Sequence, residues 1–263
     1  MPKMMYGTAW KKEATTDHVI NAIKAGFGGI DTACQPKHYR EDLVGDALAL
    51  FDREELFIQT KFTPKEGQDP TSISYNPNDP LEKQVADSFE VSKHNLKTDY
   101  VNALVLHSPL FPSSNLYKVW GAMEEIYHRG EALELGMSNC YELSVLSKLH
   151  ENATIKPTIL QNRFYGDSGY DKEIRAWCRE NGVQYQSFWS LTANPHILGS
   201  ETLFHIAKAH QKSGVQIWYR FLTQIGITPL NGTTSTEHMK EDLSIFNFEL
   251  SEVEVERIYQ LLS

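Results

Sequence analysis

Short apolar runs alternate with longer amphipathic stretches along the whole chain, which is typical of repeated strand-helix units. The runs predict eight strands, each followed by a helical pattern, at residues 3–8, 29–33, 56–62, 101–107, 132–138, 158–162, 184–189 and 226–230. Eight units give about 33 residues each, close to the repeat of a (β/α)8 barrel of ~250 residues. The pattern therefore predicts an α/β fold, a (β/α)8 barrel forming a single domain over residues 1–263.

An open, doubly wound sheet is the main alternative to a barrel. That fold predicts a Gly-rich dinucleotide loop after an early strand, but no G-x-G-x-x-G occurs, and the glycines of 26–29 precede a strand. Residues 15–17 predict a helix cap and Gly26 a helix end. Residues 63–80 and 190–200 predict long loops. Because each follows a strand, both would lie on the active face of a barrel.

Composition and charge exclude several classes of binding partner. The chain carries 25 Lys+Arg against 34 Asp+Glu, a net charge of −9, and no basic run is longer than two residues. A surface for nucleic acid or for an anionic membrane is therefore excluded. The three cysteines are too few and too far apart for a disulfide framework or a zinc site. With no apolar stretch of signal or membrane-span length, the interpretation is a cytoplasmic protein.

Ionisable side chains stand at the ends of three neighbouring predicted strands. Asp31 ends the second strand, Lys61 the third and His107 the fourth, each directly after apolar residues. Tyr39 lies in the loop that follows Asp31. Because the carboxyl ends of barrel strands meet on one face, a carboxylate, an ammonium, an imidazole and a phenol are expected to converge there.

The chemistry of this set follows from its members. A lysine beside a tyrosine is expected to lower the pKa of the phenol, and a carboxylate paired with the lysine holds the ammonium in place. The phenol then becomes a proton donor, and the imidazole can orient a carbonyl oxygen. No side chain is an evident nucleophile for the carbonyl carbon, whereas hydride from a bound nicotinamide would serve.

The chain resembles the aldo-keto reductases over nearly its whole length. The similar segments are 7–11, 30–33, 39–48, 58–61, 105–107, 136–139, 160–162 and 246–251. Each segment alone is weak, but eight in the right order are a strong match. The catalytic Asp, Tyr, Lys and His of that family fall on Asp31, Tyr39, Lys61 and His107.

The resemblance also implies NADPH as cofactor and places its contacts. Ser138, Asn139 and Gln161 match residues that bind the nicotinamide amide, and Trp189 matches the aromatic on which the ring stacks. The 231–238 segment, in which hydroxyl-bearing residues open a helix, also suits an anion without that resemblance. The implied cofactor residues are Thr8, Ala9, Asp31, Ser138, Asn139, Gln161, Trp189, Ser190, Leu191, Gly232, Thr233, Thr234, Ser235, His238, Glu241 and Asp242, and the substrate residues are Trp10, Tyr39, Tyr75 and His107.

The sequence departs from the family pattern in three ways. Asp31 and Tyr39 are eight residues apart, about three more than is usual, which we interpret as a small insertion around Pro36. Gly232 and His238 stand where Lys and Arg are common, so NADH use stays open. The usual amino-terminal hairpin and long carboxy-terminal loop are lacking, which predicts an open site partly filled by Tyr75 and its loop.

Three other classes of protein were compared with this interpretation. A barrel metallohydrolase needs an H-x-H pair, which is absent, so no metal is expected. A Schiff-base lyase would use Lys61 as nucleophile. A silent NADP(H)-binding protein would keep the nucleotide contacts but lose turnover. The expected partner is a small-molecule carbonyl substrate, and a monomer is the commonest form in the family.

Overall fold

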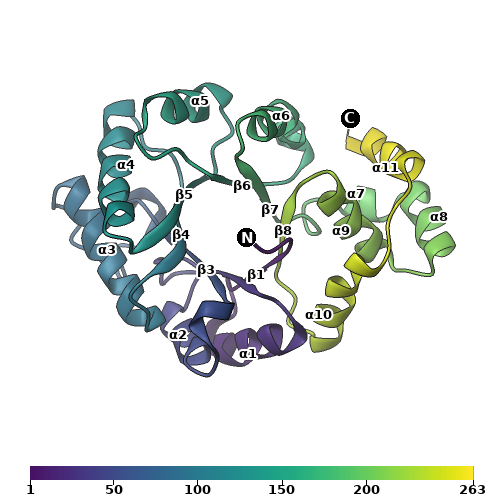
Figure 1. Ribbon diagram of the computed structural model, residues 1–263, viewed down its shortest axis with the longest axis horizontal. Coiled ribbons are helices and arrows are strands. Elements are labelled where there is room, and N and C mark those ends of the chain that lie inside the picture. The colour runs from purple at the N-terminus through teal and green to yellow at the C-terminus, as the bar shows by residue number, and fades with distance from the viewer. Residues whose placement is uncertain (263) are drawn as a thin grey trace.

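The computed structural model describes residues 1–262 and shows eight parallel strands closed into a barrel (Figure 1). Each strand pairs with its sequence neighbours, and β1 pairs with β8 to close the ring. The strands are β1 (Met5–Gly7), β2 (Gly29–Asp31), β3 (Phe57–Phe62), β4 (Val101–Leu106), β5 (Ala132–Ser138), β6 (Ile159–Arg163), β7 (Gln184–Phe188) and β8 (Thr228–Asn231).

Helices surround the barrel on its outer side (Figure 1). They are α1 (Thr15–Ala25), α2 (Glu41–Leu48), α3 (Leu81–Leu96), α4 (Ser113–His128), α5 (Leu143–Asn152), α6 (Lys172–Glu180), α7 (Pro195–Leu198), α8 (Glu201–His210), α9 (Gly214–Gln224), α10 (Thr236–Leu243) and α11 (Glu252–Tyr259). No helix in the part of the chain that the structure describes is long and apolar enough to cross a bilayer.

The predicted (β/α)8 barrel is confirmed, and all eight strands lie within two residues of their expected positions. Helix α1 ends at Gly26, whose φ of 115° suits a residue without a β-carbon. The predicted cap at the start of α1 is wrong. Ala14 is the residue before the helix and makes no side-chain cap, while the Thr15 hydroxyl donates to the Lys12 carbonyl at 2.6 Å.

The two predicted loops both follow the carboxyl ends of strands, on one face of the barrel. Residues 63–80 contain only the short 3-10 helix Lys65–Gly67, as expected for a long loop. Residues 190–200 are less irregular than expected, because Pro195 opens the one-turn helix α7 there. Proline suits this position, since the first turn of a helix needs no N–H donor.

Alternation along the strands separates a polar interior from an apolar outer layer. In β3, Gln59 and Lys61 point into the barrel, whereas Ile58 and Phe62 face the helices and join the hydrophobic core. Full burial of each such apolar side chain contributes about 1.5–3 kcal/mol. Polar residues buried inside the barrel therefore destabilise the fold unless their hydrogen-bonding groups have partners.

The amino terminus lies over the middle of the barrel (Figure 1). A β-carbon on Gly29, which opens β2, would come within 2.9 Å of Pro2 and closer still to Met5. The Met1 Sδ accepts a hydrogen bond from Gln186 Nε2 inside the barrel at 3.1 Å. The first residues thus cover the amino-terminal end of the barrel, opposite the predicted active face.

Two helical glycines differ in the space around them, and we predict that replacing each by alanine changes the free energy of unfolding in opposite directions. At Gly45 in α2, a β-carbon would stand 1.9 Å from the Asn95 carbonyl oxygen, whereas Gly121 in α4 has open space. Gly45→Ala should lower the free energy of unfolding by about 1–3 kcal/mol, and Gly121→Ala should raise it by about 0.5–1 kcal/mol. Urea unfolding measures both, and equal effects would contradict the close α2–α3 contact.

Candidate active site

A buried ion pair joins the ends of β2 and β3. Lys61 Nζ donates to both carboxylate oxygens of Asp31 at 2.7 Å and to the Thr32 carbonyl at 2.8 Å. Asp31 and Lys61 are 2% and 1% exposed, so water screens neither charge. Burial lowers the pKa of Lys61, and the charge of Asp31 opposes that shift. All three N–H bonds of the ammonium are used, which fixes its position.

Three glutamine side chains inside the barrel hold the Asp31 carboxylate. Gln59 Nε2 and Gln161 Nε2 donate to Asp31 Oδ1 at 2.7 and 2.9 Å. Both also donate to Gln186 Oε1 at 2.8 Å, and Gln186 Nε2 donates to Gln59 Oε1 at 2.9 Å and to Met1 Sδ. Because every amide N–H is used, no amide can flip without turning its oxygen toward an acceptor.

Tyr39 reaches the ion pair through a compact turn. The backbone N–H groups of His38 and Tyr39 both donate to the Gln35 carbonyl at 3.0 Å, so the extra residues around Pro36 form a closed turn. The phenol ring centre lies 5.3 Å from Lys61 Nζ and 6.1 Å from the centre of the His107 ring. The structure thus brings together all four predicted catalytic residues.

The predicted lowering of the Tyr39 pKa is wrong for this structure. Burial raises the pKa of Tyr39, and the negative charge of Asp31 raises it further. Burial is the larger cause, and no contact with Lys61 offsets it, because the three N–H bonds of Lys61 go to Asp31 and Thr32. Tyr39 is consequently a neutral phenol that retains its proton at neutral pH.

His107 is held as a neutral imidazole. Its Nδ1 is 2.7 Å from Thr63 Oγ1. Burial lowers the pKa of His107 to about 3, with the charges of Lys61 and His38 adding to the effect. When the Thr63 hydroxyl donates to Nδ1, Nε2 carries the proton and can donate it to a ligand oxygen.

Two predicted substrate residues differ in their placement. Tyr75 is 6% exposed, and its hydroxyl donates to the Thr63 carbonyl at 2.9 Å. The ring packs against Phe62 of β3, with ring centres 5.6 Å apart, and the hydroxyl supports Thr63, the partner of His107, so the expected role of Tyr75 in lining the substrate pocket stays a prediction. Trp10 is 60% exposed, and its ring centre lies 3.9 Å from that of His38, so it remains available at the mouth of the site.

A second buried carboxylate lies behind β3, outside the barrel wall. Glu41, in the first turn of α2, accepts hydrogen bonds from the Thr60 hydroxyl and, at 3.0 Å, from the Ser92 hydroxyl. Burial raises the pKa of Glu41 to about 6, and these hydrogen bonds oppose the shift. Thr60 faces outward while its neighbour Lys61 faces inward, so Glu41 is an acidic group behind the ion pair.

The residues expected to bind the nicotinamide amide lie together. The Ser138 hydroxyl donates to the Gln161 carbonyl at 2.7 Å, and the Asn139 side chain donates to the His107 carbonyl at 2.9 Å. Within residues 1–262, Gln161 Oε1 has no hydrogen-bond partner and remains an acceptor for a ligand. Trp189 has a left-handed backbone, with φ of 57°, and is 52% exposed, which leaves ring surface for stacking.

The other expected cofactor residues divide into exposed and buried ones. In the loop after β8, Gly232 and Thr234 are exposed, as are His238 and Glu241 on α10. Asp242 is 5% exposed and accepts from the Asn231 amide at 2.6 Å, so its side chain holds this loop and does not face a nucleotide. Three more of these residues point side chains inward or only partly outward: Thr8, Ser190 and Leu191.

Sequence reasoning missed several polar residues of this site. Gln59 and Gln186 escaped notice because a glutamine inside a short strand carries no motif, although Gln59 shares the face of Lys61 two residues on. Arg163, the last residue of β6, was also missed. Its guanidinium carbon lies 4.2 Å from the Trp189 ring centre and 5.2 Å from that of Tyr165.

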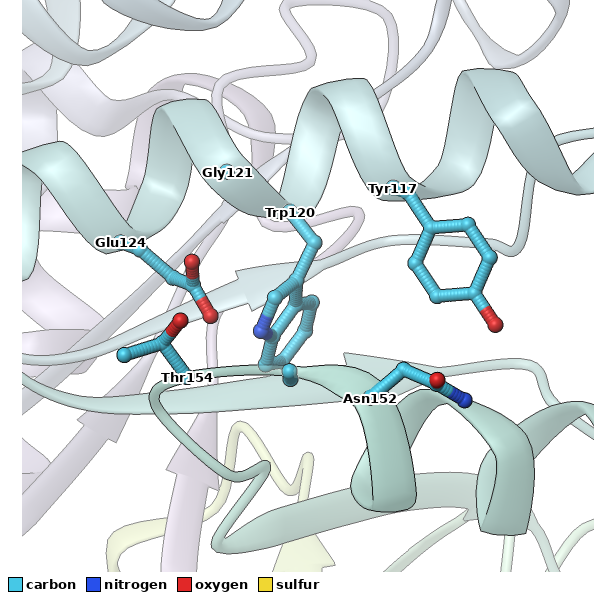
Figure 2. Close-up of a pocket in the computed structure, with 7 residues that line it drawn as sticks. Tyr117, Trp120, Gly121, Glu124, Asn152 and Thr154 are labelled. Carbon is cyan, nitrogen blue, oxygen red and sulfur yellow. The ribbon is translucent and has the colours of Figure 1, made fainter.

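Surface grooves elsewhere contain none of the predicted site residues. The groove in Figure 2 lies between Tyr117 and Glu124 of α4 and the segment that ends α5, on the outside of the barrel. Another lies between α6 and the start of β8. Across residues 1–262, no group of three His, Cys, Asp or Glu side chains could hold a metal ion. The candidate active site is therefore located by its network of buried polar residues and not by either of these grooves.

The structure is a (β/α)8 barrel whose strand ends bring a phenol, an imidazole and a buried ion pair together, and comparisons identify the family. A sequence model of the aldo/keto reductase family matches residues 3–263. Glyoxal reductase of Bacillus subtilis is 32% identical over 244 residues, which cover 92% of this chain and 82% of that protein. NADPH-dependent alpha-keto amide reductase of Saccharomyces cerevisiae is 27% identical over 282 residues, covering 97% of this chain and 84% of that protein.

A solved structure agrees. The crystal structure of MGS-M4, an aldo-keto reductase enzyme from a Medee basin deep-sea metagenome library, has a TM-score of 0.86 and 26% identity, covering 99% of this chain and 91% of that one. The chain belongs to the aldo/keto reductase family. It is accordingly an NAD(P)H-dependent oxidoreductase of carbonyl compounds.

The reciprocal amide pair of Gln59 and Gln186 predicts a non-additive effect on stability. Gln59→Leu or Gln186→Leu alone leaves buried amide groups without partners and should cost about 1–3 kcal/mol of unfolding free energy. The double variant removes both members of the pair, so its cost should be below the sum by about 1 kcal/mol or more. Chemical unfolding of the four proteins measures the coupling, and strict additivity would contradict the network.

The low pKa of His107 predicts a pH-dependent stability. Between about pH 6.5, the ordinary value, and about 3, the unfolded chain binds the proton that folded His107 does not. The contribution of neutral His107 to the free energy of unfolding is therefore complete above pH 6.5 and declines as the pH falls toward 3. The stability difference between wild type and His107→Gln should shrink over that window, with His94→Gln as the exposed control. A constant difference would contradict burial of a neutral imidazole.

Proposed function

We propose that the protein reduces small aldehydes and ketones to alcohols on the active face, with Tyr39 Oη as the proton donor to the carbonyl oxygen. The observation that carries this proposal is the convergence of Tyr39, His107 and the buried Asp31–Lys61 pair. Within residues 1–262, no other phenol and imidazole lie beside a buried ion pair, and the family uses the same four residue types.

Each residue has a role that its contacts support. Tyr39 keeps its proton until a negative charge develops on the substrate oxygen, because its pKa is raised by burial. His107 donates from Nε2 to the same oxygen and orients it, since Thr63 holds Nδ1. Lys61 lies over the phenol ring and stabilises the anion that Tyr39 becomes after donation, while Asp31 keeps the ammonium in place.

NADPH is the cofactor that the residues fit. When bound, it supplies the hydride for the carbonyl carbon. The unpartnered Gln161 Oε1 suits the amide N–H of a nicotinamide, and the half-exposed Trp189 suits a ring. Hydroxyls of the exposed loop before α10 suit phosphate oxygens, and the exposed imidazole of His238 lies in the first turn of α10. NADH stays a second possibility, because no Lys or Arg occupies position 232 or 238.

Relatives indicate the substrate type. The similar Bacillus protein is named a glyoxal reductase and the yeast protein an alpha-keto amide reductase, both acting on a carbonyl next to a second one. We extend this preference for small, activated carbonyl compounds to this chain. Its acidic charge and three buried, unpaired cysteines support a cytoplasmic protein that does not bind nucleic acid, and a monomer is the form we propose.

The same geometry supports the two alternative functions, a Schiff-base lyase and a silent nucleotide-binding protein, less well. A Schiff-base lyase needs an accessible amine, but Lys61 is 1% exposed and its N–H bonds are all used. A silent nucleotide-binding protein is favoured only by the missing hydrogen bond between Tyr39 and Lys61. Nucleotide binding without carbonyl-dependent oxidation of NADPH would identify that case.

Replacing the phenol tests the proposal directly. Tyr39→Phe should lower kcat by about 100-fold or more, the usual contribution of a general acid, and leave the Kd for NADPH within about twofold. The absorbance of NADPH measures turnover, and its fluorescence measures binding. Tyr117→Phe, on the outer helix α4 (Figure 2), is the matched control. Undiminished turnover of Tyr39→Phe would overturn the assigned role.

A further inference from the structure

Arg163 lies on the active face, directly above the catalytic layer. It is the last residue of β6, two positions after Gln161, which reaches Asp31 inside the barrel. Because strand side chains alternate, Arg163 points to the same side as Gln161, about 6–7 Å further toward the carboxyl end. Its guanidinium is therefore at the mouth of the site and not on the outer surface.

Aromatic side chains from two successive loops contact this cation, and a third contacts its backbone. The guanidinium carbon is 4.2 Å from the Trp189 ring centre and 5.2 Å from the Tyr165 ring centre. The backbone N–H of Arg163 donates to the Tyr141 hydroxyl at 3.0 Å. Stacking on the rings holds the guanidinium plane by its faces and leaves its N–H edge for a partner.

No protein group occupies that edge. Within residues 1–262, the Arg163 side chain makes no hydrogen bond and no salt bridge, and its Nε is buried without a partner. Every other arginine that is at least partly buried donates at least one side-chain hydrogen bond: Arg40, Arg53, Arg175 and Arg220. Nε is closed to a ligand by its burial, whereas the two Nη groups have no protein partner and are not buried, which points to an acceptor that a ligand brings to them.

The chemistry of that ligand follows from the charges around it. Lys61, the other cation of the site, is buried and donates its N–H groups to Asp31 and Thr32, so none is left for a substrate carboxylate. Arg163 has no acidic partner, in a chain whose net charge is −9. A planar guanidinium edge matches a carboxylate, which can accept two parallel N–H bonds. Trp189, although it contacts the guanidinium, remains 52% exposed.

We propose that Arg163 is a specificity-determining residue that binds the carboxylate of the substrate. The preferred substrates are then carbonyl compounds that carry a carboxylate, such as alpha-keto acids and carboxylated aldehydes. This inference rests on the proposed function, because it places the carboxylate in the same site as the reacting carbonyl.

Matched acids and esters test the proposal. Phenylglyoxylate and para-carboxybenzaldehyde are compared with their methyl esters, using wild type, Arg163→Met and Arg163→Lys. Loss of a hydrogen-bonded charge pair should raise KM for the acids about 10- to 100-fold in Arg163→Met, with the esters and the Kd for NADPH changed less than about twofold. Arg163→Lys should recover part of the preference for the acids. Arg179→Met, an exposed arginine on α6, is the control.

A binding measurement keeps this test independent of turnover. Mandelate carries a carboxylate but no reducible carbonyl, and calorimetry should show that it binds wild type at least tenfold more tightly than Arg163→Met. Equal mandelate binding, or a raised Kd for NADPH with no change in acid preference, would overturn the proposal, the latter by assigning the cation to the cofactor. If mandelate binding depends on Arg163 while no carbonyl is reduced, the proposed function fails and the carboxylate site stands.

Discussion

Burial of the Asp31–Lys61 ion pair is the constraint on which the rest of the site depends. A carboxylate and an ammonium inside a barrel lose hydration worth several kcal/mol each, and removing one partner typically costs about 3–5 kcal/mol. The pair is tolerated because each atom has partners, namely Thr32 for the ammonium and the amides of Gln59 and Gln161 for the carboxylate. The polar interior of the barrel is thus built around one charge pair.

Compensation within that pair sets the electrostatics of the whole face. Lys61 is paired with Asp31, and neither of the two neighbouring groups, the Tyr39 phenol and the His107 imidazole, carries a charge. Tyr39 stays a phenol, because burial and Asp31 raise its pKa, and His107 stays a neutral imidazole. The site therefore holds two neutral groups beside the ion pair, and Arg163 at the mouth is a cation without an acidic partner. In our proposals, Arg163 selects substrates by their negative charge, whereas Tyr39 donates the proton.

Sequence reasoning recovered the parts that local pattern controls. Eight apolar runs predicted the eight strands, and Asp31, Lys61 and His107 were found because ionisable residues at strand ends stand out against apolar neighbours. It failed where long-range packing decides. The pKa of Tyr39 is raised by its burial and by the charge of Asp31, both of which depend on the packed fold, and the burial of Tyr75 depends on how its loop folds. Gln59 and Gln186 meet from strands more than a hundred residues apart, so no local signal marks them.

The insertion before Tyr39 shows why spacing along the chain is a poor measure of a site. The residues around Pro36, which we interpret as an insertion, form a turn that closes on the Gln35 carbonyl, so the chain stays compact before Tyr39. Downstream, α2 is fixed because Gly45 touches the Asn95 backbone so closely that no side chain would fit between them. The position of Tyr39 is set by these two anchors, and the catalytic geometry survives because both are held by packing against β3 and α3 instead of by the number of residues between them.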